Sequence, residues 1–378
     1  MRDVYISSDN ILSPIGSTSV ENFKQLSRSV SGIQKHDYAV MSDIPFYASL
    51  FNEQDEFLRD TATKGYTKFE QLLITSISDA LKNSSVEAAD KRTVLIISST
   101  KGNISLLETE KDAASISNRI SLHHSAKQVA DHFHFINQPV VVSNACISGL
   151  LAMIMGMRFI QSGQYEHAVI AGADVISKFV LSGFQSFQAI SNEPCKPFDE
   201  SRNGINLGEG AGTIILSANK QYSKGIKLAG GSVSNDANHI SGPSRTGEEL
   251  CQAINKAMKD AAFSAADIDL ISAHGTATLY NDEMEAKAIT LAGMQHIPVN
   301  SLKGYYGHTL GAAGLIESIV SIHSLKENIV LPTIGFNKMG VTMPLNISNV
   351  LQKMPLKNCL KTASGFGGCN AAVVIAGE

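Results

Sequence analysis

One cysteine in this chain lies where a thiol can become a nucleophile. Cys146 follows the β-branched segment 140–142 and precedes the apolar segment 150–157, which has the composition of a buried helix. A thiol at the N-terminus of a helix lies near the positive end of the helix dipole, and this position lowers its pKa and favours the thiolate. We therefore expect Cys146 to be a reactive cysteine reached through a channel, although the local pattern alone fits a core cysteine equally well.

Two histidines lie in turns of small residues that let a ligand approach the backbone. His274 lies in the segment 272–278, Ser-Ala-His-Gly-Thr-Ala-Thr, and His308 lies in the segment 307–314, Gly-His-Thr-Leu-Gly-Ala-Ala-Gly. A single histidine in such a turn is more often structural than catalytic. Two of them at matching strand ends, together with a cysteine at a helix start, favour a catalytic set.

A glycine-rich turn near the C-terminus carries one aromatic residue. The segment 365–368 is Gly-Phe-Gly-Gly, a conformation that glycine permits and most residues resist. Such a turn can direct backbone N–H groups at a developing oxyanion, whereas by itself it could also be only a tight hairpin.

The elements that must position these residues alternate along the chain, which predicts an α/β fold with largely buried strands. The predicted strands are 94–97, 140–142, 167–170, 212–216, 268–271 and 372–375, and the predicted helices are 69–81, 149–160, 247–262, 282–291 and 315–325.

The two parts of the chain repeat one plan. In the first part a strand leads into the segment 98–102, and the next strand leads into Cys146 and a helix; in the second part the corresponding strands lead into His274 and, through 299–308, into His308. We therefore expect two halves, 1–222 and 223–378, that pack directly on each other with the three residues near a shared crevice.

Bulk composition excludes several classes of function. The 378 residues have a net charge of −4 and no run of Lys or Arg, which argues against nucleic acid as a partner. No apolar stretch reaches the length of a membrane span, and no signal region opens the chain, so a cytoplasmic protein without membrane partners is expected. The five cysteines have no CxxC spacing, which fits reduced thiols better than disulfides or a metal site.

Taken together, the motifs resemble those of the elongating β-ketoacyl-acyl-carrier-protein synthases of the thiolase superfamily. The matching segments are 10–16, 31–33, 144–149, 196–199, 203–204, 208–212, 274–278, 281–282, 285, 303–314 and 365–368. The resemblance covers nearly the whole chain, and it implies a thiolase-like fold of two duplicated βαβαβαββ halves in α/β/α/β/α layers.

The resemblance also implies an activity. Cys146 would take an acyl chain as a thioester, and the chain would then condense with malonyl-carrier protein as carbon dioxide leaves. His274 and His308 would stabilise the enolate, Lys303 and Glu285 would hold the histidines, and the N–H groups of Cys146 and Phe366 would form an oxyanion hole, with the Phe366 ring as a gate. The remaining implied substrate-binding residues are Thr276, Thr278, Asp282, Phe184, Gly367 and Asn370.

The implied partners follow from the same resemblance. Substrates would arrive on the phosphopantetheine of an acyl carrier protein, so no cofactor of the enzyme's own and no metal is expected. The carrier is usually acidic, and Arg59, Lys64 and Lys68 are candidates for docking it. A homodimer is expected, or a heterodimer with a chain-length factor.

Some residues depart from the family pattern. Residues 304–306 are Gly-Tyr-Tyr where serine and smaller residues are common, Cys369 stands where threonine is usual, and the region 34–56 is short. These changes leave the acyl chain open and suggest a specialised pathway, such as polyene or aromatic polyketide assembly, as an alternative to fatty acid synthesis.

Two other functions stay open as alternatives. A thiolase would use Cys146, His308 and a second cysteine such as Cys369, but it has no need of His274 in a His-Gly-Thr turn. A chain-length-factor-like subunit would only shape a partner's pocket, but such subunits usually lack the nucleophile that is present here.

Overall fold

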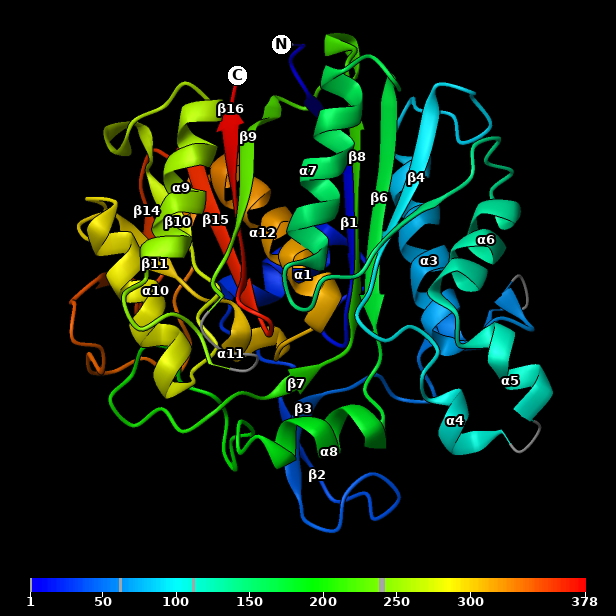
Figure 1. The fold of residues 1–378 in the computed structure, drawn as a ribbon, viewed down its shortest axis with the longest axis horizontal. Helices are drawn as coiled ribbons and strands as arrows, with labels where there is room; N and C mark the ends of the chain where they lie inside the picture. The colour runs from blue at the N-terminus through cyan, green and yellow to red at the C-terminus, as the bar shows by residue number, and fades with distance from the viewer. Residues whose placement is uncertain (1, 61–62, 111–112, 238–241) are drawn as a thin grey trace.

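The computed structural model describes residues 2–60, 63–110, 113–237 and 242–378, and its centre is a long curved sheet (Figure 1). In the described residues this sheet has eleven strands in the order β13-β11-β10-β15-β16-β9-β1-β8-β6-β4-β5. Their bounds are β1 Tyr5–Leu12, β4 Thr93–Ser98, β5 Val140–Val142, β6 His167–Asp174, β8 Gly210–Ser217, β9 Ile226–Asn235, β10 Leu270–Ser272, β11 Pro298–Asn300, β13 Asn346–Ile347, β15 Asn358–Gly365 and β16 Cys369–Gly377.

The sheet consists of two halves with one topology. The order β5-β4-β6-β8-β1 in the first half has its counterpart in β11-β10-β15-β16-β9 in the second. In each half the first three of these strands are parallel and the last two pairings are antiparallel. The halves join where β1 pairs with β9 at Tyr5 and Lys227.

Helices lie between and outside the two halves. The α-helices are α1 Ser19–Ser27, α2 Glu56–Arg59, α3 Lys68–Lys82, α4 Leu106–Thr109, α5 Ala113–Arg119, α6 Leu122–His132, α7 Ser148–Gln161, α8 Lys178–Ser186, α9 Glu248–Asp260, α10 Leu279–Leu291, α11 Lys303–Tyr306 and α12 Ala313–Glu327, and the 3-10 helices are η2 Lys220–Tyr222, η3 Ala265–Asp267 and η4 Leu310–Ala312.

The central layer is the pair α7 and α12, because each of them contacts strands of both halves and the other helix. The helices approach closely at two glycines: a Cβ on Gly149 would lie 2.9 Å from the Leu315 nitrogen, and one on Gly314 would lie 2.8 Å from the Leu150 nitrogen. All but three of the fifteen residues of α12 are buried, as expected of a helix that lies between two sheets.

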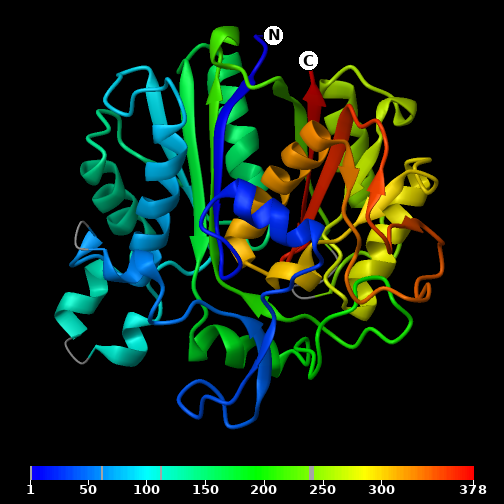
Figure 2. The ribbon, with the colours of Figure 1, turned by 180° about the vertical axis from the view of Figure 1, so that it is seen from behind.

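The outer layers cover the two remaining faces. Helices α3 and α6 pack outside the first half, and α9 and α10 pack outside the second (Figure 1). Seen from behind, α1 crosses the central layer beside α12 (Figure 2). The α/β/α/β/α layering of a thiolase-like fold is therefore confirmed.

A smaller cap lies beyond the ends of the sheet, on the side away from the chain termini (Figure 1). It contains α8 and a short sheet of β2 Gln34–His36, β3 Phe46–Ser49 and β7 Leu207–Gly208. A further pair, β12 Ile329–Val330 with β14 Gln352–Lys353, lies elsewhere in the second half.

All six predicted strands and all five predicted helices lie on observed elements, with ends shifted by a few residues. The helix predicted over 282–291 begins at Leu279, and the strand predicted over 268–271 is Leu270–Ser272. The prediction missed β1, β9 and β15, since Ser, Asn, Lys and Gly interrupt their apolar pattern.

Candidate active site

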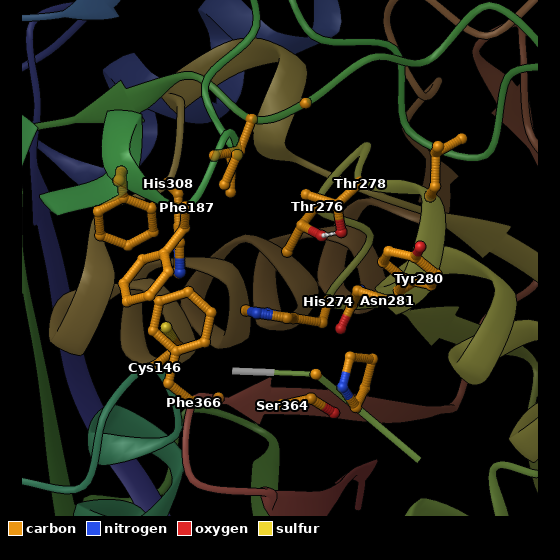
Figure 3. Close-up of a pocket in the computed structure, with 18 of the residues that line it drawn as sticks. Cys146, Phe187, His274, Thr276, Thr278, Tyr280, Asn281, His308, Ser364 and Phe366 are labelled. Atoms are coloured by element: carbon orange, nitrogen blue, oxygen red, sulfur yellow. Dashed lines mark hydrogen bonds between the residues drawn. The ribbon is translucent and has the colours of Figure 1, made fainter. Parts of the chain in front are cut away.

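Cys146, His274 and His308 meet in one cavity of about 540 Å³ (Figure 3). One ligand atom from each side chain lies within 4.8 Å of the other two, and all three residues are buried. The three come from the loops after β5, β10 and β11, which bring both halves of the sheet to one place. The thiol and the two imidazoles therefore lie close together in one cavity, as the sequence predicts.

The thiol lies on a tight connection between β5 and α7. Ala145 has φ of 45°, a left-handed conformation that non-glycine residues rarely adopt. Ser148 holds this connection, because its Oγ accepts a hydrogen bond from the Asn144 N–H at 2.8 Å and donates one to the Ala145 carbonyl at 2.6 Å. The turn at Gly365 closes over it, since a Cβ on Gly365 would lie 2.9 Å from the Cys146 nitrogen.

The expectation of a lowered thiol pKa is wrong for the resting site. Burial raises the pKa of Cys146 to about 12, and the charge of Lys303 lowers it too little to compensate. The residue precedes the first helical residue, Ser148, by two positions, and it is only 8% exposed. Loss of water around the sulfur is the largest cause of this shift, and it favours the neutral thiol in the resting site.

Both histidines are neutral neighbours of that thiol. Their rings pack edge to face with centroids 5.1 Å apart. Burial, followed by the positive charge of Lys303, holds the pKa of each histidine well below its usual value of 6.5. Among the described residues, nothing hydrogen-bonds to the Nδ1 atom of His274 or to either ring nitrogen of His308. These atoms are free to exchange protons or to hydrogen-bond a substrate.

Glu285 and Lys303 hold His274 through its backbone. The Glu285 carboxylate accepts hydrogen bonds from the N–H groups of His274 and Gly275, both at 2.7 Å, and from the Thr362 hydroxyl at 2.6 Å. The Lys303 ammonium donates to the His274 carbonyl at 3.1 Å and forms an ion pair with Glu317. The sequence prediction had named Glu285 and Lys303 as holding residues.

The sequence analysis missed Glu317 and Lys361. Lys361 is fully buried on β15, and its Nζ lies 2.7 Å from Glu317 Oε2. Each residue did leave a signal in the sequence, because each is a single charged residue inside an apolar segment. Buried charges of this kind almost always have a partner.

An aromatic cluster closes one side of the cavity. Phe366 is 38% exposed as a residue. Its ring stacks on Phe184 with centroids 5.6 Å apart and meets Phe187 edge to face at 5.3 Å. On another wall the Thr276 and Thr278 hydroxyls share a hydrogen bond of 3.0 Å and line the cavity (Figure 3). These four predicted residues are therefore at the cavity, and Phe187 is an addition.

Three residues predicted to bind substrate are not among those that line the cavity. Asp282 is buried and accepts hydrogen bonds from the Thr276 and Phe198 N–H groups, and burial raises its pKa to about 7. Asn370 bonds to Ser364 and to the Gly368 carbonyl, so it stabilises the glycine turn, and Gly367 sits on that turn with φ of 86°. Asp282 and Asn370 therefore hydrogen-bond to residues that line the cavity.

The candidate docking residues differ in their exposure and in their ion pairing. Arg59 and Lys64 are exposed, whereas the Lys68 ammonium lies 2.6 Å from Glu209, a buried carboxylate. Glu209 also accepts hydrogen bonds from the Phe51 and Ile176 N–H groups. Lys68 therefore has a structural partner, and its interpretation as a docking residue is weakened.

Sequence profiles of one family match both halves of the chain. The profile of the β-ketoacyl synthase N-terminal domain matches residues 1–222, and that of the C-terminal domain matches residues 226–337. The chain belongs to the β-ketoacyl synthase family. This membership identifies a condensing enzyme of the acyltransferase type, which confirms the family and enzyme class predicted from the sequence and decides against a thiolase.

Two curated relatives of this β-ketoacyl synthase match different shares of its length. A 3-oxoacyl-[acyl-carrier-protein] synthase 2 of Vibrio harveyi is 29% identical over 407 residues, covering 99% of this chain and 98% of the relative. A protein of the same name from Rhizobium meliloti (strain 1021) is 34% identical over 251 residues, covering 62% of this chain and 59% of the relative.

Solved structures share the fold. A ketosynthase in complex with its chain length factor from Xenorhabdus doucetiae has a TM-score of 0.87 at 24% identity, covering 100% of this chain and 98% of its own. The ishigamide ketosynthase/chain length factor has a TM-score of 0.89 at 23% identity, covering 100% and 99%.

Two further observations bear on the sequence predictions. All five cysteines are free thiols. In the described residues no helix has both the length and the apolar character needed to cross a membrane. Cys146, His274 and His308 form a group close enough to ligate a metal, so the expectation of no metal stays a prediction.

Proposed function

We propose that this enzyme is a 3-oxoacyl-[acyl-carrier-protein] synthase that condenses an acyl thioester on Cys146 with a malonyl thioester. One observation carries the proposal: a buried thiol and two neutral imidazoles converge in a single cavity, with their reacting atoms within 4.8 Å of one another. Thioester exchange needs a thiol nucleophile, and an enolate needs concentrated hydrogen-bond donors, so this set serves both steps.

In the first step the Cys146 sulfur attacks the acyl thioester carried on phosphopantetheine. Because the resting thiol is neutral, its proton must leave as the C–S bond forms, and a neutral histidine with an unpartnered ring nitrogen can accept it. The proton passes to the departing pantetheine thiol. The products are the acyl-enzyme and the free carrier.

In the second step a malonyl thioester occupies the same cavity and loses carbon dioxide. His274 and His308 donate hydrogen bonds to the enolate oxygen that forms, and the enolate carbon attacks the acyl thioester on Cys146. The Cys146 sulfur leaves as a thiolate and takes up one proton from solvent, which restores the thiol. The product is a 3-oxoacyl thioester two carbons longer.

The other residues of the site have supporting roles in this proposal. The backbone N–H groups of Cys146 and Phe366 form the oxyanion hole for the acyl carbonyl, and Gly365 permits the close approach of the two segments. Thr276 and Thr278 bind the pantetheine arm from the cavity wall. Phe366 covers the acyl entrance with Phe184 and Phe187, while Asp282, Gly367 and Asn370 keep the surrounding loops in place.

An acyl carrier protein is the proposed donor of both substrates, as the names of the curated relatives suggest. The proposed dimer partner is a second copy, which the sequence resemblance implies, or a chain-length factor, since two structural neighbours pair a ketosynthase with a chain length factor. The nucleophile and both histidines support the catalytic rather than the chain-length-factor role for this chain. We also propose that residues 1–222 and 223–378 are its two duplicated halves, that it works without a cofactor of its own, and that it resides in the cytoplasm.

The direct test is incubation of the purified enzyme with an acyl-carrier protein and malonyl-carrier protein, followed by mass spectrometry of the carrier. The proposal requires a 3-oxoacyl-carrier product two carbons longer than the acyl donor. If the product appears only after a second ketosynthase is added, and the chain takes no acyl group itself, it acts as a chain-length factor.

Carrier docking can be tested separately at Arg59, which is exposed at the end of α2. Arg59→Glu should raise KM for carrier-bound substrate several-fold, since the carrier is usually acidic, and should leave free pantetheine thioesters little changed. Arg2→Glu, at an exposed position whose partner is Glu166, is the matched charge control. Equal effects of both variants, or on both substrate forms, would rule out docking at this helix.

A further inference from the structure

A second lysine lies beneath the two histidines, and none of the roles described above uses it. Lys361 is completely buried in the middle of β15, between Leu360, which is apolar, and Thr362, which is polar. The Thr362 hydroxyl donates a hydrogen bond to Glu285. A buried ammonium is costly unless its charge and its N–H groups have partners, so its contacts indicate what it does.

The two hydrogen bonds that Lys361 donates lead to the strand end that carries His274. Its Nζ donates to the Ser272 carbonyl at 3.1 Å and to the Ala273 carbonyl at 3.0 Å. The Lys303 ammonium donates to the next carbonyl, that of His274, at 3.1 Å. Two lysines from distant parts of the chain therefore hold three successive carbonyls.

The two lysines also share one carboxylate. Glu317, from the central helix α12, pairs with Lys303 through Oε1 and lies 2.7 Å from Lys361 through Oε2. All three side chains are almost completely inaccessible to water. Such a buried triad fixes the relative positions of α11, α12 and β15, because moving any member would leave a charge unpaired.

The opposite side of the same strand end is held by acids. Glu285 accepts from the N–H groups of His274 and Gly275, and Asp282 accepts from that of Thr276 at 2.9 Å. Residues 272–276 are thus bound through their carbonyls by lysines and through their amides by carboxylates. This arrangement fixes the backbone that carries the His274 side chain, and it therefore limits where the ring can lie.

We propose that Lys361 is a positioning residue for the condensation, which acts with Lys303 through Glu317 and through the carbonyls of residues 272 and 273 to orient His274. This inference rests on the proposed function. It assigns Lys361 no contact with substrate.

The charge of Lys361 also reaches both imidazoles. The groups near the histidines are the cations Lys303 and Lys361, the acids Glu317, Glu285 and Asp282, the Cys146 thiol and the Tyr306 phenol. Both lysines lower the pKa of both histidines, after the larger effect of burial. Loss of the Lys361 charge should therefore raise the pKa of both imidazoles.

The test compares Lys361→Met, which keeps the length of the side chain, with Lys361→Gln, which keeps N–H donors but has no charge. The measurements are acyl transfer to Cys146 and the pH profile of malonyl-carrier decarboxylation. Lys357→Met is the matched control, because Lys357 is exposed and precedes β15 by one residue.

We expect both Lys361 variants to form the acyl-enzyme within about threefold of wild type, and Lys361→Met to decarboxylate about 10- to 100-fold more slowly. The acid limb of decarboxylation should lie below pH 6.5 in wild type and move up by about one unit in both variants, a typical effect of one nearby charge. Lys361→Gln should retain more activity than Lys361→Met, because its amide can still donate to the two carbonyls.

An unchanged acid limb in both variants, with folded protein that still forms the acyl-enzyme, would overturn the inference, as would an equal shift in Lys357→Met. If Lys361→Met does not fold, the acid limb of decarboxylation in Lys361→Gln decides the question. If neither variant folds, Lys361 is a structural residue and the proposal is wrong. Wild-type protein that does not decarboxylate malonyl-carrier protein would instead contradict the proposed function.

Discussion

The loops that follow β4 and β10 occupy the same place in the two halves of the sheet, yet they use their polar groups differently. After β4, the Ser99 hydroxyl and the Thr100 and Lys101 N–H groups all bond to Asp174 on β6, which also accepts from Gly311 of the second half at 2.7 Å. These four polar groups therefore all donate hydrogen bonds to the Asp174 carboxylate.

After β10, the backbone is held just as firmly, but the His274 ring is not. Its Nδ1 is without a hydrogen-bond partner in the described residues, and the ring faces Cys146 and His308 across the cavity. Buried polar groups are usually satisfied, and a buried one that is not deserves a functional explanation. One scaffold therefore forms a structural loop when its polar side chains are paired, and a loop available for chemistry when one ring nitrogen has no partner.

The largest effect should come from the residue that follows β5. Cys146→Ala should abolish acyl-enzyme formation and lower condensation by at least about 1000-fold, since it removes the thiol that forms the thioester in the proposed mechanism. Cys251→Ala, in α9 of the second half, is the matched control and should transfer acyl groups normally. An acyl thioester that still forms on the Cys146→Ala protein would show that the loop after β5 does not carry the nucleophile.

The next effect separates the two half-reactions. His274→Ala and His308→Ala should slow malonyl decarboxylation by about 100- to 1000-fold, because each removes one donor to the enolate. Transfer onto Cys146 should fall less, since either histidine can accept the thiol proton. Rapid-quench measurement of both steps checks this, and equal losses in the two steps would contradict the division.

A pair of carboxylate variants compares the two loops directly. Glu285→Gln should reduce decarboxylation about 10- to 100-fold with acyl transfer largely kept, because it disturbs the segment that carries His274. Asp174→Asn should instead cost about 2 kcal/mol of unfolding free energy and lower both half-reactions alike, since an amide cannot accept all the hydrogen bonds made to Asp174. Denaturant titration measures the unfolding free energy, and separate rate measurements follow acyl transfer and decarboxylation. If Asp174→Asn proves selective for decarboxylation, the loop after β4 is not merely structural.

The smallest effect is expected at the glycine turn. Phe366→Ala keeps the backbone N–H but removes the ring that stacks on Phe184, so it should slow condensation about three- to tenfold and leave the acyl-enzyme detectable. Assays across several acyl chain lengths test this, with Phe179→Ala, another exposed phenylalanine outside the cavity lining, as the control. Normal condensation at every chain length would reduce Phe366 to packing.

Much of the fold could be predicted because its buried strands and helices have strong apolar periods. The strands β4, β6 and β8 are buried along their whole length, and their sequences show it. Strands β1, β9 and β15 were missed because polar residues such as Asp9 and Lys361 find their partners only in the tertiary structure. The repeated plan was visible because the two halves place reactive residues after equivalent strands.

The candidate site likewise contains residues that local sequence patterns predict and residues that only the tertiary structure brings together. Cys146, His274 and His308 could be named from local turns, because a nucleophile or an imidazole needs a recognisable backbone environment. Glu317 and Lys361 left only the signal of a single charge in an apolar segment, since their pairing between α12 and β15 is a property of packing. The raised thiol pKa was also beyond local reasoning, because desolvation depends on the residues that cover Cys146, Gly365 among them.

The central claim is that Cys146 is the acylated nucleophile and that the two histidines beside it serve the second step. Peptide mass spectrometry after incubation with acyl-carrier protein, followed by a chase with malonyl-carrier protein, tests it most directly. The account predicts an acyl group on the peptide that contains Cys146, which leaves during the chase as a 3-oxoacyl-carrier product in wild type but stays on the peptide in His274→Ala. An acyl group on another residue, or one that His274→Ala releases at the wild-type rate, would contradict it.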